Sequence, residues 1–362
     1  MPTIDVHTHI LPPQLPRWAE RFGYGGFVNL ERDGPCQARL LRDDGSLFRA
    51  VAANSWDPQQ RLEDCDAAGV HVQVLSTVPV LFAYHAQGAH GLEVAQFLND
   101  HLAEVCARHP TRFVGLATLP MQAPDLAVAE LERCRVQLGL RGVQIASHIR
   151  GVNLDDPSLR TFWQRAAALG AAVFIHPWEM MGQETMPRHW LPWLVGMPAE
   201  SARAICSLLM GGVLEENPTL RLCVAHGGGS FPGTLGRIDH GWRVRPDLCA
   251  SHLREPPSQA ARRIWVDTLV HDAAALRRCL AVFGEDKLVI GSDYPFPLGE
   301  AAPGELVRGV LRGSRLRRRV EWQNAWDWLG GEVPHLASEA VNRRDSQPLS
   351  RGFDPAAKNR RK

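Results

Sequence analysis

Five side chains able to bind a metal ion lie at the ends of short apolar segments that have the composition of β-strands. His7 and His9 end the first segment, TIDVHTHI, in which strand alternation places both imidazoles on one face. His176, His226 and Asp293 follow the later segments AAVFI, RLCVA and LVIGS. Neutral imidazole and carboxylate are ligands for zinc or a similar divalent ion, with one position left open for water. The sequence therefore predicts a metal site at these strand ends, without deciding which of the five groups bind the ion.

Two further histidines near strand ends are weaker candidates. His71 lies near the start of its apolar segment, so we assign it no role in the site. His148 follows the fourth segment at the same end as the five candidates. It could line a pocket or be a hydrogen-bonded structural residue, and the sequence favours neither.

The almost complete absence of lysine limits the possible chemistry. Only three of the 40 basic residues are lysines, namely Lys287, Lys358 and Lys362. A pyridoxal-phosphate Schiff base and a P-loop are therefore excluded from the long stretch before Lys287. Binuclear hydrolases with similar ligands bridge their metals through a carbamylated lysine on the fourth strand, where this chain reads GVQIASHIR. We expect one metal ion per chain, no organic cofactor, and anion binding by arginine.

The elements that must position these side chains alternate between apolar segments and segments of helical periodicity. Residues 126–138 and 159–169 are two of the predicted helices. Alternating strands and helices favour an α/β fold with a parallel sheet, and eight units predict a closed (β/α)₈ TIM barrel. A doubly wound open sheet is the alternative, but its glycine-rich fingerprint is missing after the first strand. The eight predicted strands are residues 3–6, 70–75, 113–117, 142–145, 171–175, 220–225, 264–266 and 288–290.

Two regions fall outside this alternation. Residues 11–66 separate the first two strands and are much longer than a usual connection, which suggests an insertion that covers the site. Residues 311–320 carry five arginines, which fits the solvated face of a helix before residues 322–329. We therefore expect one barrel domain over residues 1–330, followed by a disordered basic tail over residues 331–362.

Composition argues against several classes of partner. The 362 residues carry 40 basic and 39 acidic side chains, a net charge of +1, so nothing favours nucleic acid or an anionic membrane. There is no apolar run of membrane-spanning length, and the start lacks the features of a signal peptide. The eight cysteines include no CxxC motif. We expect reduced thiols in a cytoplasmic protein.

Longer motifs resemble one known family. The histidine pair, His176, His226 and the GSDYP segment resemble the amidohydrolase superfamily. Within it, the chain is similar to the family of 2-amino-3-carboxymuconate 6-semialdehyde decarboxylases over roughly residues 1–330. The arginine-rich and tryptophan-rich stretches near the end depart from this pattern. The matching strings are RFGYGG (21–26), SWDP (55–58), STVPVLFAY (76–84), FVGLATLPMQAP (113–124), WLPWLVGMPAE (190–200), AHGGGSFP (225–232), RPDLCA (245–250), DTLVHD (267–272) and DYPFPLGE (293–300).

The resemblance implies a role for each site residue. His226 becomes the acid–base residue beside a metal-bound water, and Asp293 is both a ligand and a catalytic residue. Arg49 and Arg237 match arginines that bind substrate carboxylates, with Arg237 acting across the interface of a homodimer. Trp193 and Phe296 match aromatic side chains that line the pocket. The implied zinc ligands are His7, His9, His176 and Asp293.

The resemblance also implies a reaction. The expected enzyme is a zinc-dependent, non-oxidative decarboxylase of a small dicarboxylate, in the tryptophan (kynurenine) route or in nitroaromatic catabolism. Water could add to the conjugated substrate before CO₂ leaves, or it could only relay a proton, and the sequence leaves both open. The alternatives are a decarboxylase or hydratase of a related aromatic acid, a metal-dependent hydrolase, and a barrel that only binds a partner. The presence of Arg49, Trp193 and Arg237 favours the decarboxylase.

Overall fold

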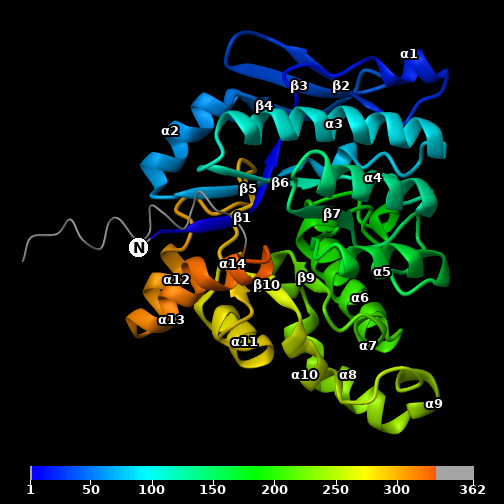
Figure 1. Ribbon diagram of the computed structural model, residues 1–362, viewed down its shortest axis with the longest axis vertical. Helices are drawn as coiled ribbons and strands as arrows, with labels where there is room; N and C mark the ends of the chain where they lie inside the picture. The colour runs from blue at the N-terminus through cyan, green and yellow to red at the C-terminus, as the bar shows by residue number, and fades with distance from the viewer. Residues whose placement is uncertain (1, 332–362) are drawn as a thin grey trace, which may run out of the picture. The chain divides into compact units, whose positions relative to one another are not determined.

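Eight parallel strands form one sheet in the computed structural model, which describes residues 2–331 (Figure 1). The sheet closes on itself, because Val6 N donates to Ile290 O and Asp293 N donates to His7 O, each at 2.8 Å. The predicted (β/α)₈ barrel is confirmed. The strands in sheet order are β1 (Ile4–Ile10), β5 (Val72–Thr77), β6 (Phe113–Ala117), β7 (Gly142–Ala146), β8 (Ala172–His176), β9 (Arg221–Val224), β10 (Trp265–Asp267) and β11 (Leu288–Val289).

Helices follow the strands and surround the sheet (Figure 1). The two helices predicted from periodicity are present as α4 (Pro124–Val136) and α5 (Arg160–Ala168). The helix expected near residue 315 is short, and a π-helical turn over Arg319–Gln323 joins it to the next one. The other helices of the barrel are α3 (Gly88–Arg108), α6 (Met197–Met210), α7 (Val213–Glu216), α8 (Phe231–Val244), α9 (Pro246–Cys249), α10 (Pro257–Ala260), α11 (Ala273–Phe283), α12 (Glu305–Val310), α13 (Ser314–Arg318) and α14 (Asn324–Trp328).

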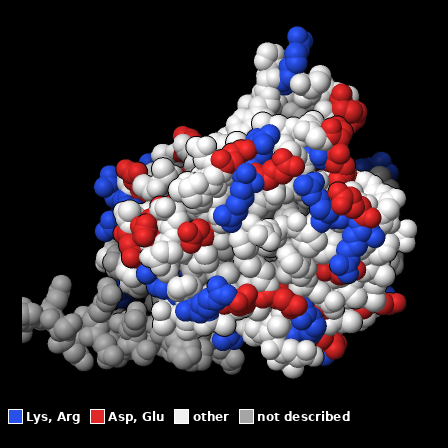
Figure 2. Space-filling model, turned by 90° about the horizontal axis from the view of Figure 1, so that it is seen from above, with Lys and Arg blue, Asp and Glu red and all other residues white. Residues whose placement is uncertain are grey.

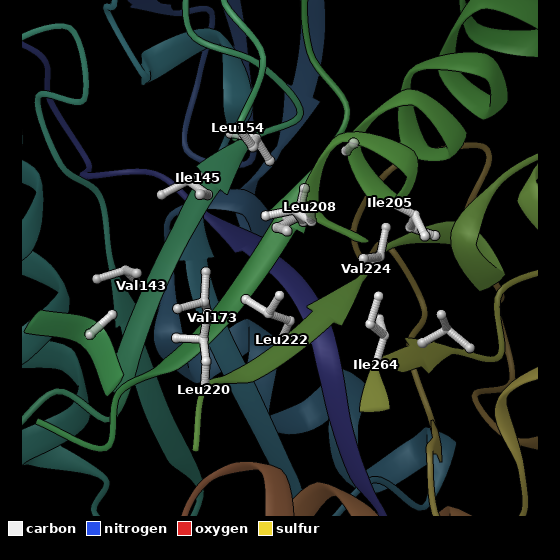
Figure 3. Packing of buried hydrophobic residues seen from close by; sticks show 14 of the residues in the cluster. Val143, Ile145, Leu154, Val173, Ile205, Leu208, Leu220, Leu222, Val224 and Ile264 are labelled. Atoms are coloured by element: carbon white, nitrogen blue, oxygen red, sulfur yellow. The ribbon is translucent and has the colours of Figure 1, made fainter. Parts of the chain in front are cut away.

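The alternation of each strand divides its side chains between the helices and the barrel interior. On β8, Val173 and Ile175 belong to the apolar cluster that the helices cover. Figure 3 shows side chains of this cluster, among them Val173 of β8, Leu222 of β9 and Leu208 of α6. The alternate residues Phe174 and His176 lie on the opposite face, toward the interior. The same alternation turns His176 toward the site.

The insertion after β1 contains a small sheet that the sequence did not predict. Strands β2 (Val28–Arg32), β3 (Gln37–Arg42) and β4 (Leu47–Ala52) form an antiparallel meander, flanked by α1 (Trp18–Phe22) and α2 (Pro58–Ala68). Its apolar side packs against α3 and the segment after β5, beside which it lies in Figure 1. The insertion is therefore a folded extension of the barrel.

The described surface carries charges of both signs, as the near-zero net charge indicates. The face in Figure 2 shows basic and acidic side chains interspersed. Surface ion pairs include Arg39–Asp33, at 2.8 Å. Within residues 2–331, every helix is too short or too polar to span a lipid bilayer. The tail predicted over residues 331–362 lies, except for Gly331, outside the described residues.

Candidate metal centre and active site

Four of the five predicted metal-binding side chains converge at one end of the barrel. One ligand atom from each of His7, His9, His176 and Asp293 lies within 4.8 Å of the others. His9 Nε2 lies 3.0 Å from Asp293 Oδ1, and His7 Nε2 lies 3.4 Å from the same oxygen. His7 and His9 are on β1, His176 ends β8, and Asp293 follows β11. All four are buried, with Asp293 the most accessible at 9%.

The hydrogen bonds of the three imidazoles leave one nitrogen of each ring facing this point. His9 Nδ1 lies 3.1 Å from Thr77 O, and His176 Nδ1 lies 2.9 Å from Pro177 O. A carbonyl oxygen only accepts, so each Nδ1 carries the proton and each Nε2 keeps its lone pair. His7 Nδ1 lies 2.7 Å from the carboxylate of Asp267, which has the same effect. The three Nε2 atoms are buried without a hydrogen-bond partner, so the residues present fit a metal ion.

The charges in the site are interdependent. Burial lowers the pKa of His9, and it lowers that of His176 further, together with the neighbouring His9. Burial also opposes a charge on His7, but its hydrogen bond to Asp267 and the charge of Asp293 raise the pKa of His7. Burial opposes the ionisation of Asp293, yet the neighbouring imidazoles of His9 and His7 hold its pKa well below the usual range. Asp293 is thus ionised and faces imidazoles, as a metal ligand must.

His226 lies beside these four groups without being one of them. Its ring centroid is 5.1 Å from that of His7 and 5.3 Å from that of His176. Its Nδ1 atom is buried and has no hydrogen-bond partner. Burial and the charge of His7 lower the pKa of His226 to about 4, so it is neutral near pH 7. The geometry suits a group that exchanges a proton with a molecule bound next to the metal.

Backbone strain aims two of these side chains. His226 and Asp293 both have a φ of +57°, in the left-handed region that costs a residue other than glycine about 1–3 kcal/mol. The glycines after His226 permit its turn, because a Cβ on Gly229 would lie 2.3 Å from Pro198 O. Such strain is typical of functional sites.

A cavity of about 330 Å³ opens onto His9, His176, His226 and Asp293. Its volume is in the range of small-molecule sites, and its wall is mainly apolar and aromatic. The insertion contributes Phe48 and Arg49 of β4, as expected for a segment that covers the site. The remaining lining residues are Val78, Pro79, Trp178, Trp190, Trp193, Leu194, Met197, Pro198, Gly229, Leu269, Val270, His271, Ala275, Phe296, Pro297 and Leu298.

Arg49 is the arginine of this cavity. Its guanidinium carbon lies 4.5 Å from the ring centre of Phe296, and Phe296 in turn lies 5.5 Å from the ring of His9. Within residues 2–331, no carboxylate forms an ion pair with Arg49, although the charge of Asp293 acts on it. Arg49 therefore offers a half-buried positive charge to an anion in the cavity.

The other predicted substrate residues fall into two groups. Phe296 and Trp193 line the cavity, and their contact with a substrate stays a prediction. Arg237 is exposed on α8 and is not part of the cavity wall of its own chain. This position neither supplies nor excludes a contact with the site of a second chain, so its role stays a prediction.

The two weaker histidines occupy structural positions. His148 Nε2 lies 3.0 Å from Glu179 O, and its Nδ1 accepts from Gly151 N at 2.9 Å, so both ring nitrogens are used within the protein. The structural alternative for His148 is therefore the one observed. His71 lies at the start of β5, where its Nδ1 accepts from Thr3 N.

Sequence reasoning missed Asp267, which orients a candidate ligand. Asp267 ends β10 and is fully buried. One carboxylate oxygen faces His7 Nδ1, and the other accepts from Gly227 N at 2.9 Å and Leu269 N at 3.2 Å. Its hydrogen bond to His7 holds the pKa of Asp267 below its usual value, although burial opposes this. The rule that located His176 and Asp293 would have located Asp267 too, because it also stands at a strand end.

Comparisons with known proteins agree over most of the chain. The family profile described as amidohydrolase matches residues 4–331. A 2-amino-3-carboxymuconate-6-semialdehyde decarboxylase of Dictyostelium discoideum is 49% identical over 90% of this chain and 91% of that protein. A protein of the same name from Caenorhabditis elegans is 38% identical over 89% and 92%. The crystal structure of a 5-carboxyvanillate decarboxylase from Sphingomonas paucimobilis has a TM-score of 0.68 and 27% identity, covering 75% of this chain and 82% of that one.

Proposed function

The chain belongs to the amidohydrolase family, and from this premise we propose that its substrate is 2-amino-3-carboxymuconate 6-semialdehyde. The products are then CO₂ and 2-aminomuconate 6-semialdehyde, in the kynurenine branch of tryptophan breakdown or in a nitroaromatic route. The class of enzyme expected from the sequence, a decarboxylase, is confirmed by the relatives, which share that reaction. One observation carries the proposal for this site: three unpartnered imidazole nitrogens and a carboxylate converge beside a cavity that contains an unpaired arginine.

The reaction defines what the cavity must do. The bond between the substrate chain and one carboxylate breaks, CO₂ leaves, and the electron pair stays on the carbon until a proton replaces CO₂. The site therefore needs charges that hold a dicarboxylate, a means of spreading the negative charge, and a proton at the reacting carbon. A wall of aromatic and aliphatic side chains also limits the access of water to these charges.

Arg49 supplies one of the charges. Its guanidinium sits over Phe296, at the same end of the cavity as His9. We assign it to the substrate carboxylate, since a planar guanidinium can bind a carboxylate with two parallel hydrogen bonds. Phe296 and Trp193 then lie against the conjugated part of the substrate.

His226 moves the proton. Because its pKa is lowered to about 4, the imidazole is neutral near pH 7 and can first accept a proton at a ring nitrogen. It then donates that proton, which comes from solvent water, to the carbon that has lost CO₂. Asp293 is ionised and lies next to His7 and His9, so its negative charge stabilises positive charge in the site.

We assign His7, His9, His176 and Asp293 as the ligands of one zinc ion per chain. Three imidazoles and one carboxylate form a donor set that zinc accepts, and no lysine is available on β7 to bridge a second ion. When bound, the ion would polarise oxygen ligands and lower the pKa of water. Metal analysis of the purified protein tests this assignment. A full equivalent of manganese or iron per chain would mean that this metal, and not zinc, is the one bound.

We propose a homodimer in which Arg237 binds the second carboxylate in the site of the partner chain. Arg237 is exposed on α8, and two large apolar side chains nearby in the chain, Val244 and Leu248, are 54% and 64% exposed. In a two-fold dimer the same contact is made twice, so both sites would be shared alike.

Mixing two inactive variants tests the shared site. Arg49→Ala and Arg237→Ala should each be nearly inactive, because a substrate carboxylate loses its partner. After co-refolding, about half of the dimers are mixed, and each mixed dimer regains one site with both arginines, so roughly a quarter of the parental activity returns. Mixed dimers without activity would place both arginines in the site of their own chain.

We further infer that the enzyme works in the reducing cytoplasm. All eight cysteines are free thiols, including the exposed Cys36. Oxidising compartments favour disulfides in proteins with many cysteines.

The assay for the substrate follows its near-ultraviolet absorbance together with released CO₂. We expect loss of absorbance with one CO₂ per substrate, and loss of both signals after removal of the metal by a chelator. Release of CO₂ from a hydroxybenzoate but not from the muconate would move the proposal to an aromatic acid. Hydrolysis of a lactone or amide without CO₂ would refute it.

A further inference from the structure

A fully buried arginine of the insertion contacts the backbone of one of the metal-binding residues, His9. Arg61 is on α2 and has an accessibility of 0%. Among residues 2–331, no carboxylate lies close enough to form an ion pair with it. A buried charge without an ion-pair partner is expensive, so its contacts should account for its presence.

The guanidinium of Arg61 contacts β1 and the segments on both sides of it, namely β5 and the residues that follow β11. One nitrogen, Nη2, donates to the backbone carbonyl of His9 on β1. The other, Nη1, donates to Gln73 Oε1 on β5 at 2.9 Å. The plane also lies against the ring of Tyr294, 4.7 Å from its centre.

Tyr294 is the residue after Asp293 and is held by the same part of the insertion. Its hydroxyl donates to Asp64 Oδ2 at 2.6 Å, and Asp64 is three residues after Arg61 on α2. Its carbonyl accepts from His9 N at 2.8 Å. Helix α2 therefore binds the backbone carbonyl of His9 and the side chain of Tyr294, the residue after Asp293.

We propose that Arg61 is a positioning residue that holds His9 and Asp293 at the distance a metal ion requires. The proposal rests on the metal centre of the proposed function. The planar fork of arginine is required for it, because the fork donates in two directions while its face contacts Tyr294. Hydrogen-bond partners of this kind commonly change metal affinity by about 10- to 100-fold when they are removed.

A purely structural role would have a different consequence. In that case, loss of Arg61 would lower the melting temperature, and the folded fraction would still bind metal as the parent does. Under the proposal, the folded protein itself binds metal less tightly and with altered ligand geometry. Metal binding, measured on folded protein, therefore separates the two.

The chain contains a matched control at the other end of the same helix. Arg112 Nε donates to His71 O at 2.9 Å, and Arg112 also pairs with Asp66 of α2 at 2.6 Å. It thus ties α2 to β5 at the strand start, far from the metal-binding ends. Arg112→Met should lower stability and leave metal binding unchanged.

The experiment compares Arg61→Met, Arg61→Lys and Arg112→Met as metal-loaded proteins. Metal retention is measured against a chelator by metal analysis, and ligand geometry is measured from the visible spectrum of the Co²⁺-substituted proteins. We expect a dissociation constant about 10- to 100-fold higher for Arg61→Met, an altered Co²⁺ spectrum, and activity that recovers partly with excess metal. Arg61→Lys keeps the charge but not the fork, and should lie between Arg61→Met and the parent.

The outcomes are distinct from those that test the substrate. Folded Arg61→Met that retains metal and the Co²⁺ spectrum of the parent overturns the proposal, whatever its activity. If Arg61→Met does not fold, Arg61→Lys decides by the same two measurements. An equal loss of metal in Arg112→Met would also overturn it, since the effect would then be general. None of these measurements depends on the identity of the substrate.

Discussion

Replacing Asp267 with asparagine should disable the metal centre by reversing the tautomer of one imidazole. Asp267 Oδ1 accepts from two backbone N–H groups, those of Gly227 and Leu269. In Asp267→Asn the amide oxygen must take the place of Oδ1, because an NH₂ group cannot accept the hydrogen bonds from Gly227 N and Leu269 N. The NH₂ group then faces His7 Nδ1. His7 must accept at Nδ1 and carry its proton at Nε2, where the metal ion requires a lone pair.

The magnitude follows from the bond that is lost. His7 Nδ1 and Asp267 Oδ2 are 2.7 Å apart and fully buried. A hydrogen bond to a charged group contributes about 1.5–3 kcal/mol. At about 1.4 kcal/mol for each factor of ten, metal affinity should fall roughly 10- to 150-fold. We expect Asp267→Asn to keep the size and fold of the parent protein, because aspartate and asparagine have almost the same shape.

The assay is competition for metal against a chelator of known affinity, followed by turnover at saturating metal. Asp272→Asn is the matched control: it changes a nearby aspartate that caps α11, and asparagine caps a helix equally well. It should bind metal as the parent does. Metal affinity of Asp267→Asn within twofold of the parent would refute the tautomer argument and the ligand role of His7.

Three further predictions concern the remaining site residues and the chain end. His226→Ala should keep its metal and lose turnover by about 10²- to 10⁴-fold, since His226 is outside the four converging groups; metal-free protein would instead make it a ligand. His176→Ala should lose metal and activity together. Its metal affinity should fall by more than the roughly 10- to 100-fold seen when a ligand loses its hydrogen-bond partner, and full metal occupancy after gel filtration would contradict this. Removal of residues 332–362 should leave metal content and kcat unchanged, because every residue of the proposed site precedes them; a tenfold fall in kcat would show that the tail contributes.

The barrel and its histidines were predictable because the same alternation produces both. Apolar residues such as Val173 and Ile175 face the helices, so the residues between and after them face the interior at a known end of the sheet. His176 could be placed from four neighbouring residues. The three-stranded sheet of the insertion could not, because strands such as β4 are short and half exposed and lack a continuous apolar pattern.

The residues that hydrogen-bond to the metal ligands were harder to predict from the sequence. Asp267 stands at a strand end like Asp293, but its bond to His7 joins residues 260 positions apart, which no local pattern indicates. Arg61 lies on a mainly polar helix without a clear apolar face, where an arginine is expected to face solvent. Arg237 is a third case, since its predicted role depends on a second chain.

The way the barrel closes has a consequence for how the protein is made. His7 and His9 belong to the first strand of the barrel to leave the ribosome, whereas Asp293 follows the last strand. Asp5 and Ser292, which hydrogen-bond across the closure, are 287 residues apart. A nascent chain therefore lacks a complete ligand set until its last strand has emerged and paired with the first. We therefore expect complete metal capture to be a late step of biosynthesis, because a chain that ends before β11 lacks Asp293 from its ligand set.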